Sequence, residues 1–240
     1  MLLSLSPLAP LPLPGGLATA LPRLSSRAHP PRPSIRALAS PDTELLPQAY
    51  FQALEYSKGG VPWDLQGRPQ PPVRSAAQEG SFGPVGTSIL DCGCGAGDNA
   101  NWLAARGYDV VGFDFCSSAI ATAVERSSSP QLAAAMTESG GSVEFVEASA
   151  LDLRSADRLH KRARELGGFA TALDSALLHC LDDEAQQRYL RGLRELMQSE
   201  GRLCVGCFSD ANPDPWSNPR RLSKEQVRFA KSFTILTLHS

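Results

Sequence analysis

The chain has 240 residues, which is enough for one hydrophobic core of the α/β type and too few for two large ones. Its formal net charge is −2, so its composition lacks the basic excess typical of nucleic-acid-binding proteins. No run of 18 apolar residues is present, so we expect neither a membrane nor a nucleic acid as partner.

The first 40 residues differ in composition from the rest. They contain no Asp or Glu, and their charge comes from Arg23, Arg27, Arg32 and Arg36 among many Leu, Pro, Ala and Ser residues. Four early prolines interrupt any helix, and no apolar run is long enough for a secretory signal. An acid-free, Arg- and Ser-containing leader is typical of an organelle transit peptide, which we assign to residues 1–40. We expect a chloroplast address (the plastid stroma), with the mitochondrion second and a disordered tail without an address as the alternative.

Residues 41–85 are predicted to form an N-terminal lid segment and loop. Residues 44–57 have an amphipathic pattern, and the Gly- and Pro-rich stretch 59–73 favours an ordered loop over a helix. That loop contains Trp63. One interpretation is that Trp63 plugs the edge of the core, and the other is that it covers a bound ligand.

The most informative stretch is an acid followed by three alternating glycines, Asp91-Cys92-Gly93-Cys94-Gly95-Ala96-Gly97. It lies between an apolar strand that includes Leu90 and a helix expected over residues 101–106. Glycine suits such a turn because the turn needs positive φ and because a Cβ would keep a nucleotide off the backbone. The free N–H groups of the helix then face the ligand. A dinucleotide fold requires G-x-G-x-x-G, but Asp98 stands where the third glycine would be.

This spacing resembles the first motif of class I S-adenosylmethionine (SAM)-dependent methyltransferases. The resemblance implies SAM as cofactor, held around Asp91, Gly93, Gly95 and Gly97. A second strand, expected over 108–114, ends in Asp114, where an acid accepts hydrogen bonds from ribose hydroxyls. A tight strand-to-helix turn without a ligand is the alternative.

The remaining elements alternate between strand and helix. One helix is expected to begin at Ser117, capped by its hydroxyl, and another to begin near Ser223. Three more are expected over 131–137, 154–166 and 183–198, and Gly201 ends the last of them. The expected strands span 142–147, 169–174, 202–208 and 233–239. This alternation predicts a doubly wound, mostly parallel α/β sheet with helices on both faces. The methyltransferase domain is assigned to residues 86–240. The resemblance implies a seventh, antiparallel strand, but only six strands are visible, so we expect the last one to be missing.

The resemblance also implies roles for residues further along the chain. Ser149 stands where the family usually has an Asp that holds the adenine amino group, and Ala150 can offer its backbone N–H to the ring. Asp174 and Ser175 end the fourth strand, at the edge where open α/β sheets bind ligands. His179 follows, as in the family's fourth motif. Asp174 and His179 are therefore the candidate catalytic residues and Ser175 a cofactor contact, with loop packing as the alternative for His179.

A second resemblance narrows the group. Pro62-Trp63-Asp64 followed by Gly67-Arg68-Pro69 resembles the N-terminal motif of the thiopurine, thiol and halide methyltransferases and their tellurite-resistance-like relatives. In that group the Trp packs near bound SAM, which implies the same for Trp63. The expected reaction is methyl transfer to a small-molecule acceptor, a thiol or a halide, with Arg220 as a possible further helper.

Three alternatives to that function remain. One is transfer to oxygen or nitrogen of a small metabolite, and another is a non-catalytic SAM-fold protein. The third is a nicotinamide-dependent oxidoreductase, which Asp98 disfavours. The sequence leaves the oligomeric state open.

Six cysteines occur, at positions 92, 94, 116, 180, 204 and 207. The Cys204-x-x-Cys207 spacing suggests a metal or redox site. It lies in an expected strand, however, where side chains three apart point to opposite faces. We therefore expect no metal and interpret all six as small buried residues.

Overall fold

Strand β1 (Ser88–Cys92) is buried along its whole length and lies inside a six-stranded sheet of order β3-β2-β1-β4-β5-β6. The other strands are β2 (Asp109–Asp114), β3 (Ser142–Glu147), β4 (Phe169–Ser175), β5 (Met197–Gly206) and β6 (Thr234–Thr237). All five adjacent pairs are parallel, so each strand must return through a crossover connection. The predicted doubly wound α/β fold is confirmed. The computed structural model describes residues 61, 63–212, 219–228 and 234–237, all within the unit Pro33–Ser240.

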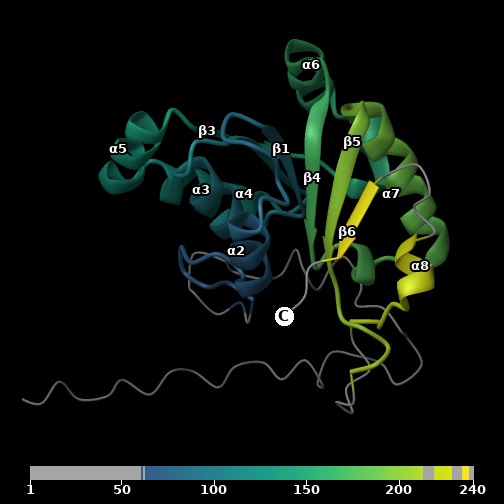
Figure 1. Cartoon of the computed structure of the whole chain (residues 1–240). Helices are drawn as coiled ribbons and strands as arrows, with labels where there is room; N and C mark the ends of the chain where they lie inside the picture. Colours follow the sequence, from purple (N-terminus) through teal and green to yellow (C-terminus); the bar gives the residue numbers. More distant parts are fainter. Residues whose placement is uncertain (1–60, 62, 213–218, 229–233, 238–240) are drawn as a thin grey trace, which may run out of the picture. The chain divides into compact units, whose positions relative to one another are not determined.

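Helices cover both faces of the sheet (Figure 1). One face carries α2 (Pro71–Gln78), α3 (Asp98–Ala104) and α4 (Ser117–Ser127). The other carries α6 (Asp157–Leu166), α7 (Asp183–Leu196) and α8 (Lys224–Arg228). Because successive strand residues point to opposite faces, Ile89 joins the first core and Leu90 the second. A further helix, α5 (Pro130–Ser139), has no buried residue.

Two predictions about helix starts were wrong, and a third was right about the start but wrong about the cap. Residues 71–73 were assigned to a loop, but Pro71 and Pro72 form the first turn of α2, where the missing N–H of proline costs nothing. Helix α3 begins at Asp98, three residues earlier than expected. Helix α4 begins at Ser117 as predicted, but its N-cap is Cys116 and no side chain caps it.

The helices predicted over 154–166 and 183–198 are shorter in the structure. A short 3₁₀ segment, η3 (Ala150–Ser155), precedes α6. Helix α7 ends at Leu196, so Met197 begins β5 instead of extending the helix. Gly201 lies within β5, close to a shift in the β4–β5 register, and does not end the helix. Glycine commonly marks such irregularities in strands, and the sequence pattern alone does not distinguish them from a helix stop.

The C-terminal elements follow the prediction more closely. Ser223 and Gln226 bond reciprocally at the start of α8, with N···O distances of 2.8 and 3.1 Å, which is a capping box. Strand β6 is the predicted sixth strand, and none of the strands in the described residues runs antiparallel. No helix in the described part of the chain is long and apolar enough to cross a bilayer. The predicted transit peptide (1–40) and amphipathic segment (44–57) lie outside the described residues.

Candidate cofactor and active site

The predicted site residues gather at one edge of the sheet. Because the strands are parallel, their carboxyl ends meet there. The register pairs Cys92 with both Phe113 and Asp174, and Asp114 with Glu147, so the ends of β1 to β4 lie side by side. The predicted residues that come from these strand ends or follow them directly are Asp91, Gly93, Gly95, Gly97, Asp114, Ser149, Ala150, Asp174 and Ser175. Trp63 belongs to the loop that precedes α2, and His179 belongs to the short 3₁₀ segment η4 (Leu178–Cys180) that follows β4.

The three glycines of the turn have φ values of 68°, 53° and 77°, in the region that side chains with a Cβ rarely adopt. Two of them are also in close contact with the chain itself. A Cβ on Gly97 would lie 2.7 Å from the Phe145 ring, and one on Gly93 would lie 3.2 Å from Leu177 Cβ. Besides shaping a ligand site, these glycines therefore let the turn and α3 pack closely against neighbouring elements.

Asp114 closes this turn from the next strand. Its Oδ2 accepts the Gly95 N–H at 3.0 Å, and its Oδ1 accepts the Cys116 N–H at 2.9 Å. Burial raises the pKa of Asp114, although these N–H groups act in the opposite direction. Each carboxylate oxygen can accept more than one hydrogen bond, so the carboxylate can hold the turn and still accept ribose hydroxyls. The ribose contact itself stays a prediction.

Two fully buried carboxyls lie near the ends of β1 and β4. Asp174 Oδ1 accepts the N–H groups of Leu177 and Leu178, both at 3.0 Å, and Asp91 lies within β1. The Oδ2 atoms of both acids are buried without a hydrogen-bond partner. Burial, together with the charge of Asp174, raises the pKa of Asp91 to about 7, and burial raises that of Asp174 to about 6. Both carboxylates therefore favour a cation nearby, and SAM carries positive charge on its sulfonium and amino groups.

The structure places His179 in the interior, with 2% of its surface exposed. Its ring stacks on Phe208 at a centroid distance of 5.2 Å, and its Nδ1 accepts the Phe208 N–H at 3.2 Å. Burial lowers the pKa of His179 to about 4, so the imidazole is neutral at pH 7 and carries its proton on Nε2. This arrangement favours the packing interpretation, in which His179 joins the loop after β4 to the end of β5.

Of the other predicted contacts, the Ser149 side chain already has a partner in the chain. Ser149 Oγ accepts the Leu151 N–H at 3.2 Å and thereby caps η3, while Ala150 is buried just after it. Ser175 ends β4, and the next residue, Ala176, has a φ of 78°. A residue other than glycine held in that region costs on the order of 1 kcal/mol, and such residues cluster at functional sites. The adenine and cofactor roles of Ser149, Ala150 and Ser175 stay predictions.

Arg220 is engaged elsewhere. Its guanidinium donates to Asp183 Oδ1 at 2.7 Å and to the Leu181 carbonyl at 3.3 Å, so its charge is paired at the start of α7. This pairing gives no direct support to a role for Arg220 in activating an acceptor.

No group of three or more His, Cys, Asp or Glu side chains in the described residues is arranged to hold a metal ion. The expectation that all six thiols are buried was wrong, since Cys94, Cys180 and Cys207 are only half-buried. Burial raises the pKa of Cys180 to about 12 and that of Cys207 to about 11, so both stay protonated at neutral pH.

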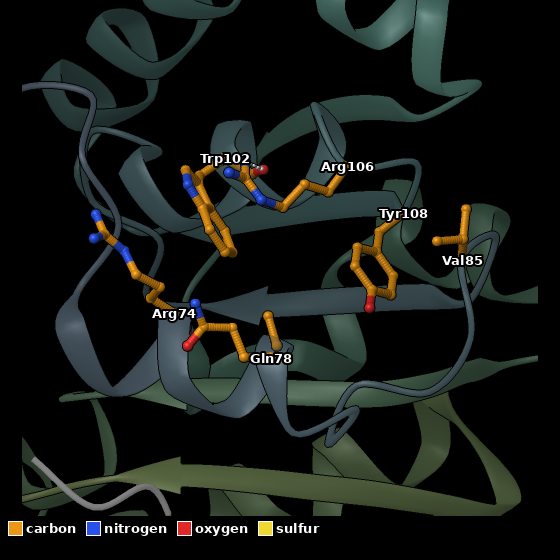
Figure 2. Close-up of a pocket in the computed structure, with 7 residues that line it drawn as sticks. Arg74, Gln78, Val85, Trp102, Arg106 and Tyr108 are labelled. Atoms are coloured by element: carbon orange, nitrogen blue, oxygen red, sulfur yellow. Dashed lines mark hydrogen bonds between the residues drawn. The ribbon is translucent and has the colours of Figure 1, made fainter. Parts of the chain in front are cut away.

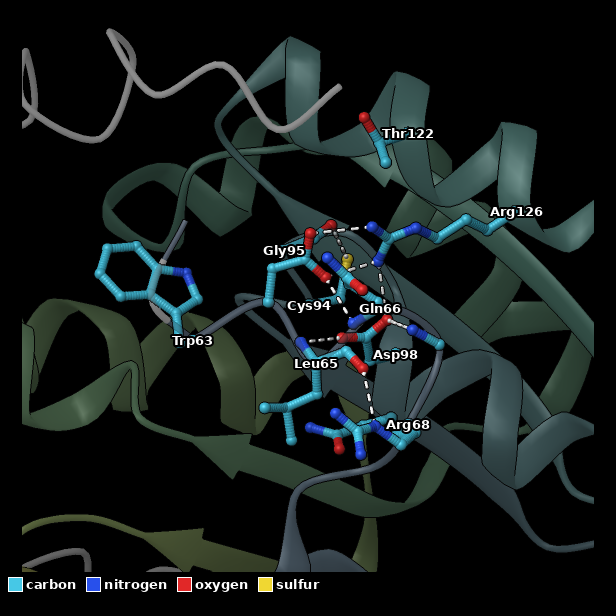
Figure 3. Close-up of polar contacts among 12 residues, drawn as sticks. Trp63, Leu65, Gln66, Arg68, Cys94, Gly95, Asp98, Thr122 and Arg126 are labelled. Carbon is cyan, nitrogen blue, oxygen red and sulfur yellow. Dashed lines mark hydrogen bonds and ion pairs between the residues drawn. The ribbon is translucent and has the colours of Figure 1, made fainter. Parts of the chain in front are cut away.

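Sequence reasoning missed a network that holds the tryptophan loop, residues 63–70, on the glycine turn (Figure 3). Asp98 accepts the N–H groups of Leu65 at 2.8 Å and Gly67 at 2.7 Å. Arg126 of α4 donates to Asp98 at 2.8 Å and forms two further 2.8 Å bonds to Asp64. The sequence did draw attention to two members of the network, Asp64 in the Pro-Trp-Asp motif and Asp98 at the position of the third glycine. No feature of the sequence around Arg126 indicated that it would bind them.

A separate hollow of about 540 Å³ lies between α2 and α3 (Figure 2). There the Arg106 guanidinium stacks 3.5 Å from the centre of the Trp102 ring, a cation–π contact. Tyr108, at the amino end of β2, lines it too. The hollow therefore lies away from the carboxyl edge and the residues predicted to bind cofactor.

The crossover sheet, its glycine turn and the acid that ends β2 define the class of protein: a class I SAM-dependent methyltransferase, with SAM as its cofactor. The sequence pattern of the thiopurine S-methyltransferase (TPMT) family matches residues 50–237 of this chain. The chain belongs to this family, which confirms the resemblance inferred from the Pro-Trp-Asp motif.

Individual relatives are more distant. A 2-heptyl-1-hydroxyquinolin-4(1H)-one methyltransferase of Mycobacteroides abscessus is 28% identical over 180 residues, covering 74% of this chain and 69% of its own length. A thiopurine S-methyltransferase of Pseudomonas syringae is 28% identical over 143 residues, covering 56% and 61%. The solved structure described as "Conversion of a Disulfide Bond into a Thioacetal Group during Echinomycin Biosynthesis" is 25% identical with a TM-score of 0.55, covering 76% of this chain and 74% of that one.

Proposed function

We propose that this methyltransferase acts on a small-molecule thiol or halide. The observation that carries the proposal is the family match over residues 50–237, which includes the Pro-Trp-Asp loop held on the glycine turn. Two similar proteins also carry sulfur in their names or descriptions, the thiopurine S-methyltransferase and the structure concerned with a thioacetal.

Bound SAM supplies a methyl group attached to a positively charged sulfur. When the acceptor attacks the methyl carbon, the carbon–sulfur bond breaks and the sulfur leaves as a neutral thioether. The chain has to hold that cofactor, aim an acceptor at the methyl carbon and exclude water. The glycine turn and Asp114 form the binding surface, and Asp91 and Asp174 add negative charge that suits a cationic cofactor. Trp63 offers an aromatic face, which attracts a positive charge. His179 holds the loop after β4 to the end of β5 through the Phe208 N–H.

A labelled-methyl assay with thiols, halides and phenols tests this proposal. We expect methyl thioethers or methyl halides as products. With a thiol acceptor the rate should rise with pH toward the thiol pKa of roughly 8.5, because the thiolate is the nucleophile. Methyl ethers or N-methyl products, with thiols and halides inert, would contradict the acceptor class and leave the cofactor assignment intact.

A hydroxyl on a nitrogen heterocycle is the second candidate acceptor. It is favoured by the hydroxyquinolone methyltransferase, whose match covers 74% of this chain. Including a 1-hydroxyquinolone in the panel separates the two candidates. SAM binding without a product from any acceptor would instead support a non-catalytic SAM-fold protein.

We also propose that residues 1–40 direct the chain to plastids. The supporting observation is the leader without acidic residues that contains four arginines. Residues 1–45 fused to a fluorescent protein should give a plastid pattern in plant cells, and the same fusion with the four arginines changed to Glu should not. Diffuse or mitochondrial fluorescence of the unchanged fusion would contradict the assignment.

A further inference from the structure

The tryptophan loop is fixed by an ion triad whose two carboxylates are less exposed than the acid of any other arginine–acid pair in the described residues. The exposed fractions of the side chains are 24% for Arg126, 1% for Asp64 and 10% for Asp98. The pair formed by Arg158 and Glu144 exposes 64% and 40%. Exposed pairs contribute little, whereas removing one partner of a buried pair leaves an uncompensated charge and has a large effect.

Each member of the triad belongs to a different element. Asp64 is in the loop, Asp98 is in the first turn of α3 and Arg126 is near the end of α4. The hydrogen bonds from Arg126 to both acids and the negative charge around it raise the pKa of Arg126, so the guanidinium stays charged. One guanidinium therefore links two carboxylates that would otherwise repel each other.

The loop has further bonds to the same helix end. The N–H of Gln70 donates to Asn99 Oδ1 at 2.9 Å, and the Gln70 side chain donates to the Trp63 carbonyl at 3.0 Å. Trp63 itself packs against Val61 and against Ala96, Cys116 and Ala119, which come from the glycine turn and the start of α4. In Figure 3 its ring lies apart from the triad. The triad thus fixes the backbone of the loop, while the ring packs against Cys116, whose N–H donates to Asp114.

We propose that Asp98 and Arg126 are positioning residues, which hold the tryptophan loop on the glycine turn so that Trp63 forms a fixed wall of the cofactor site. All partners belong to the chain, so the loop does not need SAM to stay in place. The part that concerns cofactor binding rests on the proposed role of Trp63. The part that concerns the loop does not depend on it.

The direct test is hydrogen exchange at the Leu65 and Gly67 amides, which both donate to Asp98. In Arg126→Met the two carboxylates face each other without a cation, and the simplest relief is for the loop to detach. Exchange at these amides should then become at least about tenfold faster, since it reports local opening. Arg126→Lys, which keeps the charge but not the two-pronged geometry, should lie in between. Arg158→Met is the matched control and should not change them.

The second readout is SAM affinity measured by calorimetry, which does not require turnover. Arg126→Met should weaken binding roughly tenfold, and so should Trp63→Ala, because both remove the same wall. The double variant should have about the same affinity for SAM as whichever single variant has the lower affinity, since the effects of residues that act through one contact do not add. Asp64→Ala breaks the triad from the loop side and gives a second route if Arg126→Met folds poorly.

These measurements separate the possible failures. Unchanged exchange at Leu65 and Gly67 in both Arg126→Met and Asp64→Ala would overturn the whole proposal. Faster exchange with unchanged SAM affinity would overturn the part that concerns cofactor binding. Additive losses in the double variant would contradict the link through Trp63. Absence of methyl transfer to every acceptor would count against the proposed function alone, because neither readout depends on catalysis.

Discussion

Asp114→Ala is expected to weaken SAM binding by about 1.5–3 kcal/mol, which is roughly 10- to 150-fold in Kd. The carboxylate is predicted to accept the ribose hydroxyls, and hydrogen bonds to a charged acceptor have this magnitude. It also accepts the Gly95 and Cys116 N–H groups, so its loss releases the turn on which the cofactor lies. Asp114→Asn, which keeps one oxygen and the shape, should lose less.

The control lies at the opposite end of the same strand. Asp109 begins β2 and pairs with Arg162 at 2.8 Å at the amino edge of the sheet. Asp109→Ala should leave the affinity for SAM unchanged although it also removes a carboxylate from β2. Equal affinities of the Asp114 and Asp109 variants in calorimetry would show that Asp114 does not contact the cofactor.

Asp91→Asn should make the cofactor-free protein more stable at pH 8 than the unaltered chain, and it should weaken SAM binding. Burial and the charge of Asp174 raise the pKa of Asp91 from 3.8 to about 7. Since the pKa is raised on folding, the stability associated with the neutral acid is fully present below about pH 4 and is lost as the pH rises through 7. A shift of this size corresponds to at most roughly 4 kcal/mol, so the advantage of the Asn variant should be large at pH 8 and absent at pH 4.

Bound SAM should counteract the stability advantage of Asp91→Asn at pH 8. A cation favours the ionised form of Asp91, so the Kd for SAM should fall as the pH rises from 6 to 8 in the unaltered chain and vary less in Asp91→Asn. Denaturant unfolding at pH 4, 6 and 8, with and without SAM, measures both effects. Parallel pH profiles of stability for the two proteins would contradict the raised pKa, and pH-independent SAM binding in both would contradict the electrostatic role.

The site was predictable only where its residues follow the local pattern. The alternating glycines and the acid at the end of the next strand are local features of a strand–turn–helix unit, and the structure places all of them on one edge. His179 is different. Its distance from Asp174 in sequence resembles a catalytic motif, but burial and the Phe208 N–H decide its protonation and its partner. Those depend on a residue 29 positions away.

The sequence alone determined the class of fold, the cofactor family and the order of the elements. These features depend on residues that are close together in the chain, namely the periodic apolar positions of each strand and helix and the glycines of the turn. Only the tertiary structure decided where helices give way to strand at Met197, which acids lose their solvent and what holds Trp63. Arg126 lies 62 residues from Asp64 and 28 from Asp98, and no local pattern pairs them. Their meeting results from the packing of α3 and α4 on the same face of the sheet, since that packing brings three distant charges within bonding distance.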